Sequence, residues 1–341
     1  MALILLILSI VPVAFFAYQI YKRDFDKEPG SILVKLFCCG VGSAFLTLFI
    51  TFVLQTIIPF FGSDTANLDV IELIPYVFIG IALIEELSKW IFVYKLEYND
   101  NEFNHLYDGI VYAAFVSLGF ACFENILYVM SSGIQTAIVR ALLAIPGHLC
   151  DGIMMGYYLS MAKLALCNNN KTLSKKNLIL SLLVPTLAHG AYDYLIFASD
   201  VSENNLFMLA FFAFVIFFFT LASKKVKQLS TNIYNLNPNY VSITARKKQN
   251  VVNPYGQINN TYNQYTYPQS SVTNNYNNNN YPQQPVNNIY TTNGYQQVSP
   301  NNFYNNNIYP QQTVTNNVVK YCNNCGNKVI GKYCDKCGKQ V

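Results

Sequence analysis

Charged side chains are scarce in this chain of 341 residues. They make up 12% of the sequence, whereas about 25% is usual for soluble domains. Hydrophobic residues make up 52%, and the mean hydropathy is +0.23, so the composition disfavours a soluble enzyme. The net charge is only +4, and the Lys and Arg residues are scattered around apolar segments. No nucleic-acid partner is therefore expected, because nucleic acid needs a concentrated basic face.

Acidic residues are almost absent from the C-terminal third. Of the 18 acidic residues, 17 lie before residue 230, and Asp335 is the exception. Residues 231–320 contain 25 Asn and 12 Tyr but no Asp or Glu. This composition offers few aliphatic side chains to bury, so it predicts a disordered Asn-, Tyr- and Gln-rich linker over residues 229–320. A self-associating or partner-binding tract is the alternative.

Long apolar runs fill the first two-thirds of the chain. A helix needs about 20 mostly apolar residues to cross the hydrocarbon core of a bilayer, and seven segments predict an all-α, multi-pass membrane bundle over residues 1–228. Pro146 and Gly147 interrupt the fifth segment. A membrane helix tolerates such an interruption where neighbouring helices form hydrogen bonds to the freed backbone groups. The first segment lacks a basic start, so we expect a spanning helix and no cleaved signal peptide. The segments are residues 2–21, 33–60, 71–94, 108–130, 137–163, 177–198 and 205–223.

Basic residues alternate between the connecting loops. Lys and Arg follow the first, third, fifth and seventh segments, whereas residues 61–70, 131–136 and 199–204 contain neither. Cytoplasmic loops carry the excess of Lys and Arg. We therefore expect a protein of the cell membrane with its N-terminus outside and its C-terminus in the cytoplasm.

The chain ends in two Cys-x-x-Cys motifs, each followed by Gly. Four thiolates at this spacing suit tetrahedral Zn²⁺, and the Gly lets backbone N–H groups turn toward the sulfur atoms. We interpret residues 321–341 as a zinc ribbon with one structural Zn²⁺, available to a cytoplasmic protein partner. Disulfides are an alternative that the reducing cytoplasm disfavours, and a mononuclear iron site is another. The predicted ligands are Cys322, Cys325, Cys334 and Cys337.

Ionisable residues occur inside four of the predicted membrane segments. Each costs roughly 2.5–3.5 kcal/mol on insertion scales, so each needs a reason. Two of the three histidines are among them. The residues are Glu85, Glu86 and Lys89 in the third segment, Glu124 in the fourth, His148 and Asp151 in the fifth, and His189 and Asp193 in the sixth.

Helical spacing sorts these residues into faces. Glu86 is turned about 100° from Glu85, so one of the two carboxylates faces the bundle centre while the other braces it. A carboxylate one turn from an imidazole can hold its tautomer. Four helices are therefore expected to project carboxylates and imidazoles into one internal cavity. The pairs that share a face four residues apart are Glu85 with Lys89, Glu124 with Tyr128, and His189 with Asp193.

A carboxylate and an imidazole in a water-holding cavity are what hydrolysis requires. The carboxylate takes a proton from water, and the imidazole assists it or stabilises the oxyanion. The same side chains could instead bind a catalytic divalent metal that acidifies the water. No His-Glu-x-x-His motif is present. The structural alternative is a set of buried ion pairs that lock the bundle, which Lys89 and Tyr128 fit well.

The residues around these positions resemble the PrsW-type intramembrane proteases, which belong to the superfamily of CAAX-prenyl and bacteriocin-processing proteases. The resemblance covers about residues 20–200, with four motifs in order, each on its own helix. An acidic turn after the first helix adds to it. The motifs are Glu85-Glu86-Leu87-Ser88-Lys89; Asp108-Gly109 running to Glu124-Asn125 and Tyr128; Pro146-Gly147-His148 with Met155-Gly156-Tyr157-Tyr158; and His189-Gly190-Ala191-Tyr192-Asp193, and the turn is Asp24 to Pro29.

The resemblance implies a helical bundle that cleaves a membrane-anchored protein near or within the lipid bilayer. In bacterial relatives such a substrate can be an anti-sigma factor. The family's paired Glu and late His imply catalytic roles for Glu85, Glu86 and His189. We add Glu124 and His148 as catalytic candidates, with Lys89, Tyr128 and Asp193 as supporting residues. The tail and the ribbon lie outside the resemblance.

Two other classes of function compete with a peptidase. One is a non-catalytic membrane scaffold or sensor, whose zinc ribbon recruits a cytoplasmic partner and whose polar cluster is structural. The other is a transporter with the carboxylates as a proton relay. Transporters often contain internal repeats, and the sequence has none that we detect.

The ribbon hypothesis predicts that a peptide of the last 21 residues binds one Zn²⁺ and folds only with it, because so short a chain cannot form a core. Cys334→Ser should unfold this module and leave the membrane bundle intact, since the linker separates them. Metal analysis and NMR of the peptide test this. Unchanged NMR dispersion in excess chelator would contradict the hypothesis.

Overall fold

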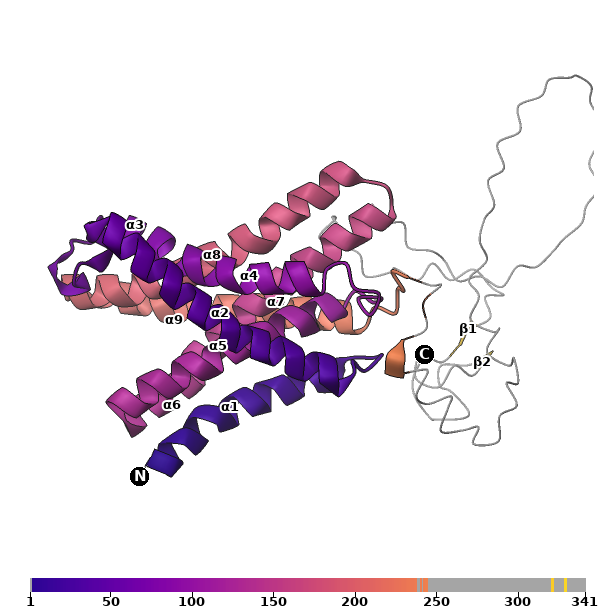
Figure 1. Ribbon diagram of the computed structural model, residues 1–341, viewed down its shortest axis with the longest axis horizontal. Coiled ribbons are helices and arrows are strands. Elements are labelled where there is room, and N and C mark those ends of the chain that lie inside the picture. Colours follow the sequence, from indigo (N-terminus) through magenta and orange to yellow (C-terminus); the bar gives the residue numbers. More distant parts are fainter. Residues whose placement is uncertain (1, 238–239, 241, 245–319, 322–327, 330–341) are drawn as a thin grey trace, which may run out of the picture. The chain divides into compact units, whose positions relative to one another are not determined.

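The computed structural model describes residues 2–237, 240, 242–244, 320–321 and 328–329. The chain divides into two units, Met1–Tyr281 and Pro282–Val341. The described part of the first unit is helical (Figure 1). Its elements are α1 (Ala2–Arg23), α2 (Gly30–Ile57), η1 (Pro59–Gly62), η2 (Thr65–Asn67), α3 (Leu73–Val77), η3 (Phe78–Leu83), α4 (Ile84–Leu96), α5 (Asp108–Ser132), α6 (Ile134–Leu142), α7 (Ala144–Cys167), α8 (Lys171–Ser202) and α9 (Asn205–Ser230).

The described part of the second unit is one pair of short strands. β1 (Lys320–Tyr321) pairs antiparallel with β2 (Lys328–Val329), with Lys320 opposite Val329. The four predicted zinc ligands and most of the predicted linker lie outside the described residues. The zinc ribbon therefore stays a prediction.

Six helical stretches within the described residues are long and apolar enough to cross a membrane. They correspond to six of the seven predicted segments. The remaining prediction, residues 71–94, corresponds to α3, η3 and α4, which follow one another without a gap. η3 is a π-helix, so this stretch is helical throughout but not regular. Such π-helical turns are frequent at functional sites.

The predicted interruption of the fifth segment occurs three residues before Pro146. α6 ends at Leu142 and α7 begins at Ala144. Pro146 therefore lies in the first turn of α7, where its missing N–H would have no helical partner in any case. The helix that precedes it begins directly after Gly133, whose φ of +84° turns the chain out of α5. The predicted span 137–163 thus begins inside α6.

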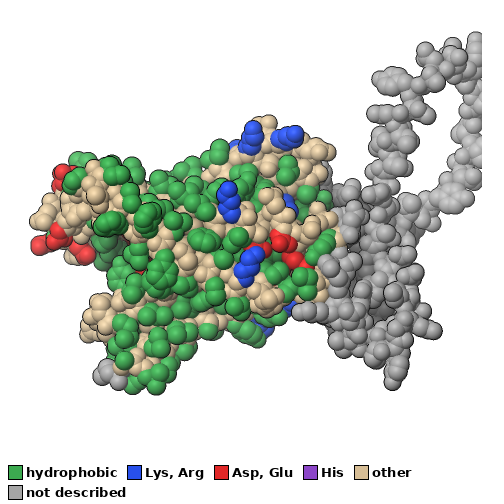
Figure 2. Space-filling model, in the orientation of Figure 1, with side chains coloured by type: hydrophobic (Ala, Val, Ile, Leu, Met, Phe, Trp, Pro, Cys, Tyr) green, Lys and Arg blue, Asp and Glu red, His purple; other side chains and the backbone are tan. Residues whose placement is uncertain are grey.

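The outer surface of the bundle is apolar. Figure 2 shows hydrophobic side chains over most of the visible face of the helices and few charged ones. Large side chains such as Leu3, Phe52 and Ile216 are more than two-thirds exposed. A soluble protein would bury such surface, whereas lipid tails cover it at no cost. The helical unit is therefore that of a multi-pass membrane protein.

α5 forms the centre of the bundle and packs closely on two neighbours. A methyl group added to Gly40 of α2 would overlap the backbone oxygen of Val116, and one added to Gly119 of α5 would overlap that of Phe37. On the other side of α5, the backbones of Gly109 and Gly156 meet in the same way. Small residues at helix crossings let membrane helices approach closely. These crossings fix α2 and α7 against α5.

Two acidic side chains of the turn between α1 and α2, Asp24 and Glu28, are buried. The Glu28 side chain accepts a hydrogen bond from the Tyr112 hydroxyl at 3.0 Å. Burial, with the nearby carboxyls of Asp108 and Asp24, raises the pKa of Glu28 to about 10. The Glu28 carboxyl is therefore protonated at neutral pH, and the turn packs against the bundle without a full negative charge.

The α2–α5 crossing gives a prediction about stability. Gly40→Ala should destabilise the solubilised protein by about 1–3 kcal/mol, because an extra methyl group must push two backbones apart. Gly42→Ala on the same helix is the matched control, since its added methyl would meet only the Phe92 side chain, at an ordinary 3.5 Å. Thermal unfolding in detergent compares the two. Equal stability of both variants would contradict the close crossing.

Candidate active site

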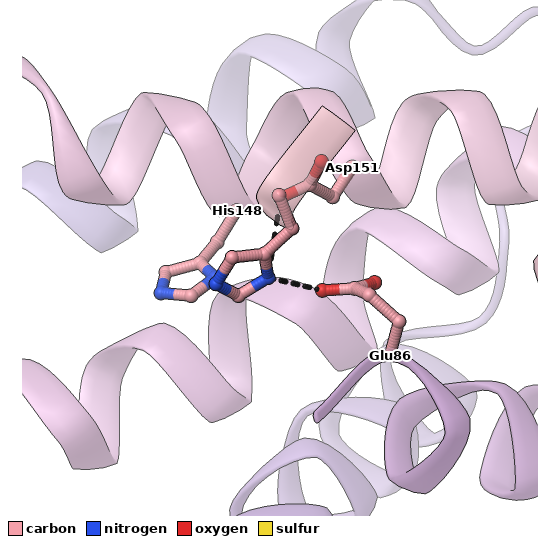
Figure 3. A group of neighbouring side chains, drawn as sticks. Glu86, His148 and Asp151 are labelled. Atoms are coloured by element: carbon pink, nitrogen blue, oxygen red, sulfur yellow. Dashed lines mark hydrogen bonds and ion pairs between the residues drawn. The ribbon is translucent and has the colours of Figure 1, made fainter. Parts of the chain in front are cut away.

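The ionisable residues of four helices meet inside the bundle. α4 contributes Glu85, Glu86 and Lys89, α5 contributes Glu124, α7 contributes His148 and Asp151, and α8 contributes His189 and Asp193. Figure 3 shows Glu86 of α4 close to His148 and Asp151, which both lie on α7. The structure thus brings together all the predicted catalytic candidates.

Glu86 is the most enclosed carboxylate of the group. Its side chain has no exposed surface, and its Oε1 accepts a hydrogen bond from Lys89 Nζ at 2.8 Å. The same oxygen lies 2.9 Å from Nδ1 of His189. A carboxylate accepts and does not donate, so Nδ1 carries the proton of this bond. Glu86 therefore fixes both the ammonium group and the orientation of the imidazole.

Lys89 connects α4 to α5 and α7. Its Nζ lies 3.2 Å from His148 Nδ1, 3.7 Å from Glu85 Oε2 and 4.0 Å from the centre of the Phe120 ring. The expected pairing of Glu85 with Lys89 is confirmed, but Glu86 is the closer partner. An ammonium group only donates, so Nδ1 of His148 accepts.

The tautomer of neutral His148 follows from this contact. With Nδ1 accepting, the ring proton lies on Nε2, which is 2.9 Å from Glu124 Oε2. The same oxygen accepts a hydrogen bond from Arg140 at 2.7 Å. Arg140 also donates to the Asn125 side chain at 3.0 Å. A chain of hydrogen bonds therefore runs from Arg140 through Glu124 and His148 to Lys89.

The second ring nitrogen of His189 faces two further carboxylates. Nε2 lies 3.4 Å from Asp193 Oδ2 and 3.8 Å from Glu85 Oε2. The expected proximity of His189 and Asp193 is confirmed. Asp151 Oδ2 lies 3.8 Å from Nδ1 of the same ring. His189 is thus surrounded by carboxylates from three helices.

Tyr128 lies at the edge of the group and not within it. Its side chain is about half exposed, and its ring contacts the Arg140 guanidinium, 4.3 Å from the ring centre. It shares the face of Glu124 as expected, but its nearest charged partner is the arginine. Tyr128 thus contacts Arg140, which in turn donates a hydrogen bond to the Glu124 carboxylate.

A cavity of about 400 Å³ opens beside the polar group, between α2, η3 and α5. Glu85 and Glu124 both line it. Glu85 Oε2 is buried and has no hydrogen-bond partner among the described residues. Of the two adjacent glutamates, Glu85 therefore lines the cavity, whereas Glu86 is enclosed by Lys89 and His189.

The residues present fit a divalent metal. One donor atom each from Glu86, His148, Asp151 and His189 lie within 4.8 Å of one another, and all four side chains are buried. Two imidazoles and two carboxylates suit Zn²⁺ and similar ions. Glu86 Oε2 and Asp151 Oδ1 are buried without a hydrogen-bond partner in the described part of the chain, so the group holds unused ligand atoms.

Two residues of this group are not among the predicted site residues. Arg140 is a lone arginine inside an apolar stretch, where an unpartnered charge is costly, and this cost indicates a buried partner. Asp151 follows His148 by three residues on the same face of one helix, and this spacing indicates that it lies in the same group.

Comparison with known proteins identifies the chain. Residues 28–221 match the PrsW family of intramembrane metalloproteases. "Protease PrsW" of Geobacillus kaustophilus is 38% identical over 220 residues, which cover 63% of this chain and 87% of that protein. "Protease PrsW" of Bacillus subtilis is 35% identical over 218 residues, which cover 64% of this chain and 93% of that protein. "Protease PrsW" of Clostridioides difficile is 32% identical over 201 residues, which cover 58% of this chain and 80% of that protein. No solved structure matches. The chain belongs to the PrsW family of intramembrane metalloproteases, and it is a peptidase of the membrane.

Proposed function

We propose that this protein hydrolyses a peptide bond of a membrane-anchored protein, such as an anti-sigma factor, with water activated by Glu85. The observation that carries the proposal is that Glu85 lines the cavity between α2, η3 and α5, while its Oε2 atom makes no hydrogen bond among the described residues. A carboxylate beside space for water, with an oxygen that accepts no hydrogen bond, is suited to act as a general base.

Glu85 would take a proton from water as the water oxygen attacks the carbonyl carbon of the substrate. The C–N bond then breaks, and the amide nitrogen leaves with a proton returned by the Glu85 carboxyl. His189, held through Nδ1 by Glu86, presents Nε2 toward Glu85 and stabilises the oxyanion. Asp193 orients the same ring from its other side.

Glu124 and His148 form the second half of the proposed site. Glu124 reaches the cavity, and Arg140 and His148 hold its carboxylate. The cations of Lys89 and Arg140 favour the negative charge that develops on the substrate oxygen. We also propose that the N-terminus is outside and the C-terminus cytoplasmic, supported by the alternation of basic loops.

The roles of the two adjacent glutamates can be tested by substitution. Glu85→Gln and Glu86→Gln should each lower cleavage by about 10²–10⁴-fold, because the first removes the base and the second releases His189. Asp193→Asn should cost only about tenfold, because that side chain orients the ring from a distance. Immunoblots of tagged single-span reporter proteins, co-expressed with each variant, measure cleavage.

The control is the amount of protein in the membrane, by which each cleavage rate is divided. Glu85→Gln should accumulate to the wild-type amount because Gln keeps the size of Glu, whereas Glu86→Gln removes the closest charged partner of buried Lys89 and should accumulate less. A Glu85→Gln, Glu86→Gln double variant that cleaves a reporter at the wild-type rate would contradict the proposed function.

We propose, as the alternative arrangement of the same residues, that Glu86, His148, Asp151 and His189 hold a catalytic divalent cation, with the His189 imidazole a ligand in place of its contact with the oxyanion. Five carboxylates lie in this group with only two permanent cations, Lys89 and Arg140. A divalent ion would offset this excess of negative charge in an interior of low polarity. Such an ion would polarise the substrate carbonyl and acidify bound water.

Metal analysis tests this proposal in protein whose predicted zinc ribbon is disrupted, so that only metal bound at the intramembrane site is measured. Protein carrying Cys334→Ser, purified without chelator, should retain about one divalent ion that Asp151→Asn in the same background loses. A chelator should abolish cleavage, and added Zn²⁺ should restore it. Metal-free protein that cleaves at the full rate would contradict a catalytic ion.

A further inference from the structure

The cavity beside Glu85 contains a second polar atom that the protein does not use. The Thr47 side chain on α2 lines this cavity and is about nine-tenths buried. Its hydroxyl has no hydrogen-bond partner among the described residues. Other hydroxyls of α2 bond to their own helix: Ser43 donates to the Gly40 carbonyl at 2.6 Å, and Thr56 donates to the Phe52 carbonyl at 2.8 Å.

The rim of the cavity is open to the side of the bundle. Leu48 of α2 and Leu127 of α5 line it, and each is about half exposed. These side chains belong to the apolar outer surface that lipid covers. α2 crosses the bundle next to α4 and α5 (Figure 1). A membrane-embedded segment could therefore reach Glu85 sideways, between α2 and α5, without leaving the bilayer.

The part of the cavity wall that α2 forms carries small side chains. Ala44, Thr47 and Thr51 lie on one face of α2, whereas α5 lines the cavity with larger side chains such as Phe123. Small side chains leave room for a backbone to approach, so an extended segment can come close to α2. A second groove of about 410 Å³ is lined by residues of α4 and α8 such as Trp90 and by neither Glu85 nor Glu124.

The chemistry of peptide hydrolysis specifies what must enter. A carbonyl within a helix is bonded to the N–H four residues on, so the scissile segment has to be extended. Inside the bilayer each freed backbone group then needs a new partner, since water is absent. Thr47 offers one hydroxyl, which can donate or accept, in the same cavity as the proposed base.

We propose that the α2–α5 cavity binds the unwound, extended part of a substrate's membrane anchor, and that Thr47 positions it by a hydrogen bond to its backbone. This inference rests on the proposed function. It makes Thr47 a substrate-positioning residue and the α2–α5 face the route of entry.

Substitution of Thr47 tests the hydrogen bond. With purified protein in lipid vesicles and a single-span reporter that the wild type cleaves, Thr47→Val should lower kcat/KM by about fivefold to tenfold, the worth of one hydrogen bond. Thr47→Ser should retain cleavage because it keeps the hydroxyl. Thr56→Val, the same change on the same helix at a hydroxyl that is already bonded, should leave cleavage unchanged.

Thermal unfolding of the same variants separates positioning from folding. Removal of an unpaired buried hydroxyl should leave stability equal or higher, so Thr47→Val should unfold no earlier than the wild type while cleaving more slowly. Wild-type cleavage by Thr47→Val would overturn the inference. Cleavage by the Glu85→Gln, Glu86→Gln double variant would instead overturn the proposed function.

A photo-crosslinking amino acid tests the route of entry. Placed at Leu127 in Glu86→Gln protein, it should capture the reporter. At Ile179, a lipid-exposed position in the second groove, it should not. Capture at Ile179 and none at Leu127 would overturn entry between α2 and α5.

Discussion

The ammonium group of Lys89 is buried, and its contacts organise the centre of the bundle. Its side chain is completely buried, 2.8 Å from Glu86, 3.2 Å from His148 and against the Phe120 ring. Removal of one partner of such a buried pair costs about 3–5 kcal/mol, because the other charge is left unpaired. Through these contacts, and through Glu86 to His189, one cation ties α4 to α5, α7 and α8.

Most of the helices, and most of the residues that meet in the polar group, can be predicted from local sequence patterns. Long apolar runs predicted six of the spanning helices, because the bilayer thickness fixes their length. The spacing of four residues predicted that Glu85 meets Lys89 and that His189 meets Asp193. The cost of an ionisable group in lipid predicted that polar residues on different helices would share one interior.

Contacts between helices were harder to predict, because they depend on how each helix is rotated and how closely it packs. Arg140 lies 16 residues after Glu124 on another helix, and no periodicity connects them. The directions in which Glu85 and Glu86 point depend on η3, because a π-helix changes the angle about the helix axis of the residues that follow it. The sequence indicated that one glutamate would face inward, but not which one.

The polar atoms of the site differ in how well they are satisfied. Glu86 Oε1 and both ring nitrogens of His148 have hydrogen-bond partners within the bundle. Glu85 Oε2 and the Thr47 hydroxyl have no hydrogen-bond partner among the described residues. An unpaired buried polar atom costs about 1–3 kcal/mol. An extended peptide in the bilayer carries the same deficit, so binding relieves both at once. A segment that stays helical has no free backbone group to offer and gains nothing at this cavity. The proposed site therefore prefers substrate segments whose helix unwinds easily. The same lack of hydrogen-bond partners in the bilayer makes the bundle pair its own charges and makes unwound segments bind at this cavity.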